Sequence, residues 1–267
     1  MRAATRLVII LQFLTYASLC LSLQTSTTRI QVCQNKDCQK RFQKFSSSEN
    51  LVQTFSDLLP PFSSSSVTVE STGCLGQCGQ GPNVSISRSS SEGRMEKIFG
   101  SVDDGMMASA ILEVGGGIEA PDLLLIAVEG IGRSTRVTSP EKKIKILTPV
   151  ITSLLSDEKS NSLDKSTALA HALVLRADAY LEQALLSPGS SSNSNTIHEA
   201  HTDAQMAISI NHLDGRAYRV LADAEEALGN VIGAMDAVSK WAEVNPSFGT
   251  KARKELARLA SAGSSAP

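Results

Sequence analysis

Four of the five cysteines stand in two closely spaced pairs, and their thiols have the clearest chemistry in the chain. Cys33 and Cys38 form a C-x4-C pair, and Cys74 and Cys78 form a C-x3-C pair 35 residues further on. The second pair lies within Gly73–Val84, where glycines let the backbone wrap closely round a ligand and direct its amides inward. Four convergent thiolates with amides near their sulfurs are what an iron–sulfur cluster needs. The pattern therefore favours a [2Fe-2S] site.

Other uses of four cysteines stay open at this point. A structural zinc site takes the same four thiolates, although zinc sites more often show C-x2-C knuckles. Two disulfides would form if the chain folds in an oxidising compartment. Neither alternative needs the glycines of the second loop. A thiol–disulfide exchanger would need a C-x-x-C pair, which the sequence lacks, and Cys20 lies in an apolar N-terminal run where it is expected to act as an apolar side chain.

Short strands and helices are predicted around the two cysteine pairs, in the order strand, helix, three strands, helix. From β-branched or alternating apolar residues, the strands are expected at 29–33, 67–69, 84–86 and 95–99. A Ser/Gly turn between the last two strands predicts a hairpin. From apolar periodicity and the proline or glycine runs that end it, the helices are expected at 48–59 and from 103 or 104 to 114.

This order, with a cysteine pair after each of the first two strands, resembles the thioredoxin-like [2Fe-2S] ferredoxins. That family includes the cluster-bearing small subunit of NADH-oxidising complexes. The resemblance covers about ninety residues and is most specific at Cys74-Leu-Gly-Gln-Cys78-x-x-Gly-Pro-Asn-Val84. It implies that Cys33, Cys38, Cys74 and Cys78 hold the cluster. It also implies an electron-transfer protein, alone or as a subunit of an oxidoreductase complex, rather than an enzyme by itself. The family usually has aromatic residues after this motif, at its dimer contact, where the present chain has serines. The resemblance therefore leaves a homodimer open for this chain.

The C-terminal region changes to alanine-rich helix with a repeat near 34 residues. The clearer copy runs from Tyr218 to Pro246, and a degenerate copy precedes it around Ala177 and Ala204. These positions resemble tetratricopeptide repeats, and a plain alanine-rich bundle is the alternative. Stacked helical pairs imply a surface that docks a redox or cluster-assembly protein. No G-x-G-x-x-G motif follows a predicted strand, so electrons are expected to come from a protein partner.

The N-terminal residues indicate a targeting leader. Arg2 and Arg6 precede an apolar run from Leu7 to Leu23, and no acidic residue occurs before Asp37. A basic start and a short apolar stretch are typical of a signal peptide, and the acid-free continuation suits an organelle transit peptide. The run is at the short limit of the ~17–25 residues that span a bilayer, so a membrane anchor is the alternative. The mature chain is expected to have no membrane span.

Composition and the leader narrow the partners and the compartment. A net charge of −2, one Trp and three Tyr argue against nucleic-acid binding, which needs positive charge and stacking side chains. Iron–sulfur clusters are assembled in cytosol, mitochondria and plastids. An ER-type leader that continues as a transit peptide therefore predicts a plastid protein, with the mitochondrion as the alternative.

The sequence thus predicts an α/β thioredoxin-like ferredoxin domain followed by an all-α, TPR-like helical-repeat domain. We predict a cleavable leader at 1–27 and the ferredoxin domain at 28–117. A helical connector follows at 118–165, with helix starts at Ser139-Pro140 and Thr148-Pro149. The TPR-like domain is predicted at 166–262. The predicted function is a one-electron carrier or cluster carrier. The alternative is an adaptor in which the cysteines hold structural zinc and the helices carry the function.

Overall fold

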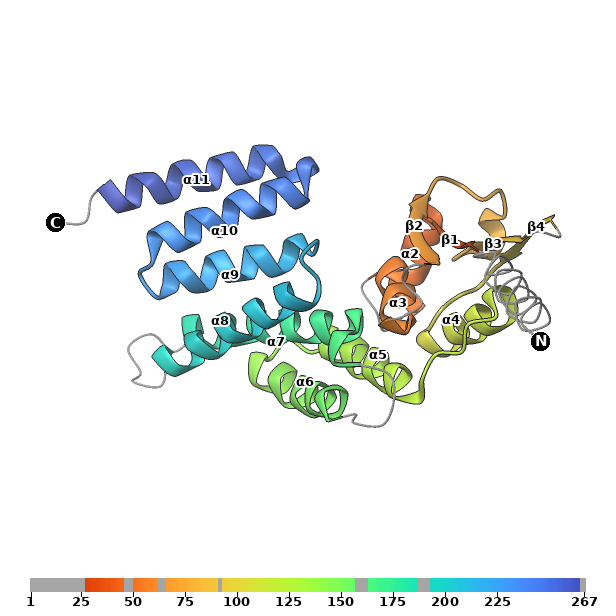
Figure 1. The fold of residues 1–267 in the computed structure, drawn as a ribbon, viewed down its shortest axis with the longest axis horizontal. Helices are drawn as coiled ribbons and strands as arrows, with labels where there is room; N and C mark the ends of the chain where they lie inside the picture. The colour runs from red at the N-terminus through yellow and green to blue at the C-terminus, as the bar shows by residue number, and fades with distance from the viewer. Residues whose placement is uncertain are drawn as a thin grey trace, which may run out of the picture.

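The computed structural model describes residues 27–45, 50–61, 66–90, 93–156, 163–186 and 193–264. The predicted leader lies outside these residues except for Thr27, which begins the first strand. Within them, a four-stranded mixed sheet in the N-terminal half is followed by helices only (Figure 1), so the expected α/β-then-all-α class is confirmed. Across the described ranges, no helix combines the length and the apolar character that crossing a bilayer requires.

The sheet contains β1 (Thr27–Cys33), β2 (Val67–Thr72), β3 (Val84–Ser90) and β4 (Gly93–Phe99) in the order β2-β1-β3-β4. Strand β1 pairs in parallel with β2 and antiparallel with β3, and β3 pairs antiparallel with β4. Because side chains alternate between faces, Ile30 shares one face with its partners Val69 and Ile86. All four strands and the predicted hairpin lie where the sequence placed them.

Three helices and a π-helical turn belong to this half of the chain. Helix α3 (Leu51–Leu58) is capped by Asn50, and α4 (Gly105–Ile111) by Asp104, as the cap position 103 or 104 predicted. The turn Leu112–Gly116 follows α4 and ends at Gly117, whose positive φ favours glycine.

Helix α2 (Lys36–Phe45), which follows the first strand, was not predicted from the sequence. Cys38 lies on α2, one turn before Phe42, and both side chains are buried. Cys38, Phe42 and Phe45 follow the i, i+4, i+7 spacing of one helix face, but this apolar stripe covers only two turns of an otherwise polar segment.

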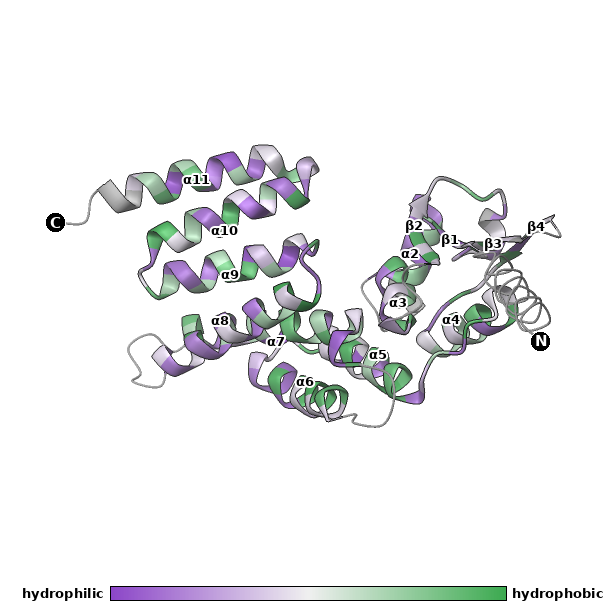
Figure 2. Cartoon of the chain, viewed as in Figure 1, coloured by the Kyte–Doolittle hydropathy of each residue, from purple (hydrophilic) through white to green (hydrophobic). Residues whose placement is uncertain are grey.

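The C-terminal half is a series of antiparallel helices that pack on their neighbours, most visibly α8 to α11 (Figure 1). The helices are α5 (Asp122–Thr135), α6 (Pro140–Leu155), α7 (Thr167–Leu186), α8 (Asn193–Ile210), α9 (Gly215–Ala227), α10 (Val231–Val244) and α11 (Gly249–Ser264). Figure 2 shows hydrophobic and hydrophilic segments alternating along them, as expected for helices with one buried face. Alanines allow close approach, and Ala177, Ala200 and Ala204 are fully buried.

The predicted helix start at Thr148-Pro149 is wrong, because α6 continues through Pro149. Ser139 caps α6 and Pro140 occupies its first turn, as expected. Pro149 is exposed and has no backbone amide to donate into the helix. In the same turn, the hydroxyl of Thr148 donates to the carbonyl of Ile144 and adds a side-chain hydrogen bond to the helix. Leu147 and Val150, which flank this turn, are buried in the same core as helices α7 to α9.

The two halves are joined by a seam in which α3 contacts α5 and α7. The imidazole Nδ1 of His171 lies 2.7 Å from the Oδ2 atom of Asp57, and both side chains are buried. Gln53 donates to the other carboxylate oxygen of Asp57 at 2.8 Å and accepts from Arg216 at 3.2 Å. A connected polar network therefore fixes the helical half against the sheet half.

Candidate metal centre

The strand order brings the two cysteine-bearing segments together. Central strand β1 ends at Cys33, with the end of β2 on one side and the start of β3 on the other. The β2–β3 loop, which contains Cys74 and Cys78, must therefore cross the end of β1. The amide of Cys33 donates to the carbonyl of Asn83 at 3.0 Å, and the amide of Gln34 donates to the carbonyl of Thr72 at 2.9 Å.

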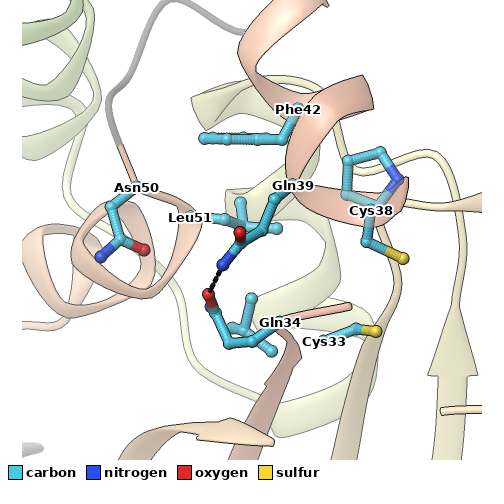
Figure 3. A pocket seen from close by; sticks show the side chains of 9 residues that line it. Cys33, Gln34, Cys38, Gln39, Phe42, Asn50 and Leu51 are labelled. Carbon is cyan, nitrogen blue, oxygen red and sulfur yellow. Dashed lines mark hydrogen bonds between the residues drawn. The ribbon is translucent and has the colours of Figure 1, made fainter. Parts of the chain in front are cut away.

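The second loop also contacts the thiol on α2. A Cβ atom placed on Gly81 would lie only 2.5 Å from the Sγ atom of Cys38, so only glycine leaves room for this approach. Cys33 and Cys38 are 4% and 1% exposed. Their sulfur atoms point to the same side, away from Asn50 and from the hydrogen-bonded pair of Gln34 and Gln39 (Figure 3). The first two predicted ligands are thus buried side by side beneath the second loop.

Hydrogen bonds from several elements fix the path of the second loop. The Arg41 guanidinium on α2 donates to the carbonyl of Gly79 at 2.7 Å. The side-chain amide of Asn83 donates to the carbonyl of Gln77 at 2.7 Å. After β4, the amide of Ser101 donates to the carbonyl of Gln80 at 2.6 Å. The loop is therefore held in place through the carbonyls of Gln77, Gly79 and Gln80.

Cys74, the first member of the second pair, differs from Cys33 and Cys38 in exposure. Cys74 is exposed, and the amide of Gly76 donates to its Sγ atom at 3.4 Å, the type of contact that stabilises a thiolate ligand. Cys78 begins a 3₁₀ turn, Cys78–Gln80, and its side chain is not among the described parts. Among the side chains that are described, no three from Cys, His, Asp and Glu lie together in a way that could hold a metal.

These residues fit an iron–sulfur cluster in donor chemistry and in the placement of their loops. Soft thiolates select iron–sulfur clusters or zinc, and an amide directed at sulfur suits the former. The glycine that touches Cys38 forms a cradle that any side chain would fill. Cys33, Cys38, Cys74 and Cys78 would hold the cluster.

The difference in exposure predicts the order in which the thiols react. In the metal-free chain, iodoacetamide is expected to alkylate Cys74 much faster than Cys33 and Cys38, because only exposed thiolates meet the reagent. Peptide mass spectrometry after timed alkylation measures each site separately. Equal rates at Cys33 and Cys74 would contradict the buried position of the first pair.

Comparison with known proteins gave no match to a family model, a curated protein or a solved structure.

Sequence reasoning identified the thiols but not all of the residues that position them. Arg41 was not singled out, although it links α2 to the second loop. Asn83 was quoted only as part of a motif, and its side chain joins the end of the loop to Gln77 in the middle of the loop. Asp57 and His171 gave no signal, since they are 114 residues apart and sit among ordinary polar residues.

Proposed function

We propose that this protein carries one electron at a time, or delivers a cluster, through a [2Fe-2S] centre on Cys33, Cys38, Cys74 and Cys78. The observation that carries the proposal is the contact of the second loop with the first cysteine pair, where Gly81 touches the Sγ atom of Cys38. Strand pairing brings the two cysteine segments together, and glycine at this contact leaves the Cys38 thiol facing the second loop.

The strand arrangement supports a thioredoxin-like ferredoxin domain. Its order β2-β1-β3-β4, with β3 antiparallel to its neighbours, is that of the thioredoxin-like fold. A cysteine pair follows each of the parallel strands β1 and β2, the placement that the family resemblance implies. The outward side of α2 beside Cys38 has Lys36, Lys40 and Arg41 exposed, and this positive charge would offset part of the charge of four thiolates.

When bound, the cluster supplies one-electron redox chemistry. The residues of this chain would then bind and shield it. Gly81 permits the close approach of backbone, Gly76 directs its amide at the Cys74 sulfur, and Arg41 holds the loop in place. The TPR-like helices would dock the redox or assembly partner, and the leader would direct the protein to a plastid or, alternatively, to a mitochondrion.

The direct test is anaerobic purification of the full chain, followed by a visible spectrum and metal analysis. A reddish protein with about two irons per chain is expected, and Cys74→Ser should lose the colour because one of four thiolate ligands is removed. Colourless protein with one tightly bound zinc would contradict the proposal and favour an adaptor with a structural zinc site. A red spectrum that survives Cys74→Ser would contradict this ligand set.

A further inference from the structure

Two helices of the C-terminal half, α7 and α9, present side-chain stripes of the same spacing to one surface groove. On α7, Asp178, Leu181, Glu182 and Leu185 follow the i, i+3, i+4, i+7 spacing of one helix face. On α9, Arg219, Ala222, Asp223 and Glu226 repeat the same spacing. Helices α7 and α9 contact each other, so the two stripes face a common space.

That space is a continuous groove made of two cavities. The larger, of about 530 Å³, lies between α7 and α9 and is also lined by Ile197 of α8. The smaller, of about 210 Å³, extends from α9 to Trp241 on α10 and Glu255 on α11. Arg219 and Asp223 line both cavities and therefore join them.

The side chains that line the groove include more carboxylates than cations, namely Asp178, Glu182, Asp223, Glu226 and Glu255 against Arg219 and Lys251. Glu182 is also paired with Lys143 at 2.8 Å. Arg219 lies 2.9 Å from an oxygen of Asp178 and 3.0 Å from one of Asp223, so one guanidinium serves two carboxylates. Each ion of this group is roughly 40% exposed, which leaves it open to another charged group.

A second arginine beside the groove is likewise shared by two carboxylates. The Arg258 guanidinium is shared by Glu226, at 2.7 Å, and Glu255. Burial raises the pKa of Asp223, and the nearby carboxylates of Asp178, Glu255 and Glu226 raise it further against the opposing effect of Arg219. A cation placed in the groove would relieve this repulsion.

Apolar side chains flank the acidic groups. Leu185 lines the groove and is 80% exposed, and Leu186 beside it is 72% exposed. Leu181 and Ile197 form an apolar floor nearby. Large apolar side chains left exposed at the edge of a groove are typical of surfaces that bind another protein.

From the matching stripes, the shared carboxylates and the exposed leucine, we propose that this groove binds a basic amphipathic segment of a partner protein. Apolar side chains of the segment would cover Leu185 and Leu181, and its Lys or Arg side chains would meet the carboxylates around Arg219 and Arg258. This inference rests on the helical half being the docking module of the proposed function, and it specifies the chemistry of the partner.

The test uses the full chain, with and without iron, and a fluorescein-labelled amphipathic peptide of leucine and lysine, read by fluorescence anisotropy. Asp223→Lys and Leu185→Ser are each expected to weaken binding by about tenfold, the loss of one charge contact or one apolar anchor. The matched controls are Asp236→Lys and Ile232→Ser on α10, both exposed and outside the groove residues. They should leave the affinity unchanged, and rising salt should weaken binding.

Three results would overturn the inference. The groove and control variants could weaken binding equally, or a leucine–glutamate peptide could bind as well as the lysine peptide. A dimer of the chain that Leu185→Ser abolishes, with no peptide binding, would assign the groove to self-association. Because peptide binding is measured separately from colour and iron content, failure of the groove and failure of the cluster proposal are distinguishable.

Discussion

Replacing Asp57 by alanine is expected to lower the free energy of unfolding by about 1–3 kcal/mol, because the change leaves the His171 ring buried without its hydrogen-bond partner. The Asp57 carboxylate accepts from His171 at 2.7 Å and from Gln53 at 2.8 Å. Because Asp57 and His171 are both buried, water does not replace the hydrogen bond between them. The Nε2 atom of His171 already lacks a hydrogen-bond partner among the described residues, so removing the Nδ1 partner would leave the whole ring unsatisfied.

Urea unfolding followed by circular dichroism measures this effect. Glu243→Ala is the control, because its exposed ion pair with Lys240 on α10 should contribute less than about 1 kcal/mol. Replacing both Asp57 and His171 by apolar residues should recover part of the loss, since no buried polar group is then left unpaired. A single Asp57→Ala variant as stable as Glu243→Ala would show that the seam does not fix the two halves together.

Replacing Gly81 by alanine is expected to prevent the cluster from being retained, while the same change at Gly79 should not. The new Cβ atom at Gly81 would lie 2.5 Å from the Sγ atom of Cys38, so either the thiol or the loop must move. Nothing lies within 4 Å of a Cβ atom at Gly79, two residues earlier in the same loop. Overpacking costs about 1–3 kcal/mol, which corresponds to about a 5- to 150-fold fall in an equilibrium constant.

Iron per chain and visible absorbance after anaerobic reconstitution measure the difference between the two alanine variants. Far-UV circular dichroism of both metal-free proteins shows whether the fold survives, so that loss of cluster is not confused with loss of structure. Equal iron content in the two variants would mean that the approach of Gly81 to Cys38 plays no part in the metal centre.

The local signals in the sequence were sufficient for most elements near the site. β-Branched and alternating residues located all four strands, and the caps at Asp104 and Ser139 marked helix starts. Local sequence rules failed for two helices, α2 and α6. The apolar stripe of α2 covers only two helical turns, and Pro149 remains inside α6 because its neighbours Leu147 and Val150 are held in the core.

Residue types and their spacing show which atoms could do chemistry, namely the thiols of two cysteine pairs beside a glycine-rich loop, and they also show the alanine-rich helices. Which of these groups meet depends on the tertiary fold. Pairing of β1 with both β2 and β3 places the second loop over Cys33 and Cys38, and packing of α3 on α7 places Asp57 against His171. Such contacts depend on the pairing of segments far apart in the chain, and residue spacing does not encode which distant partners will pack together.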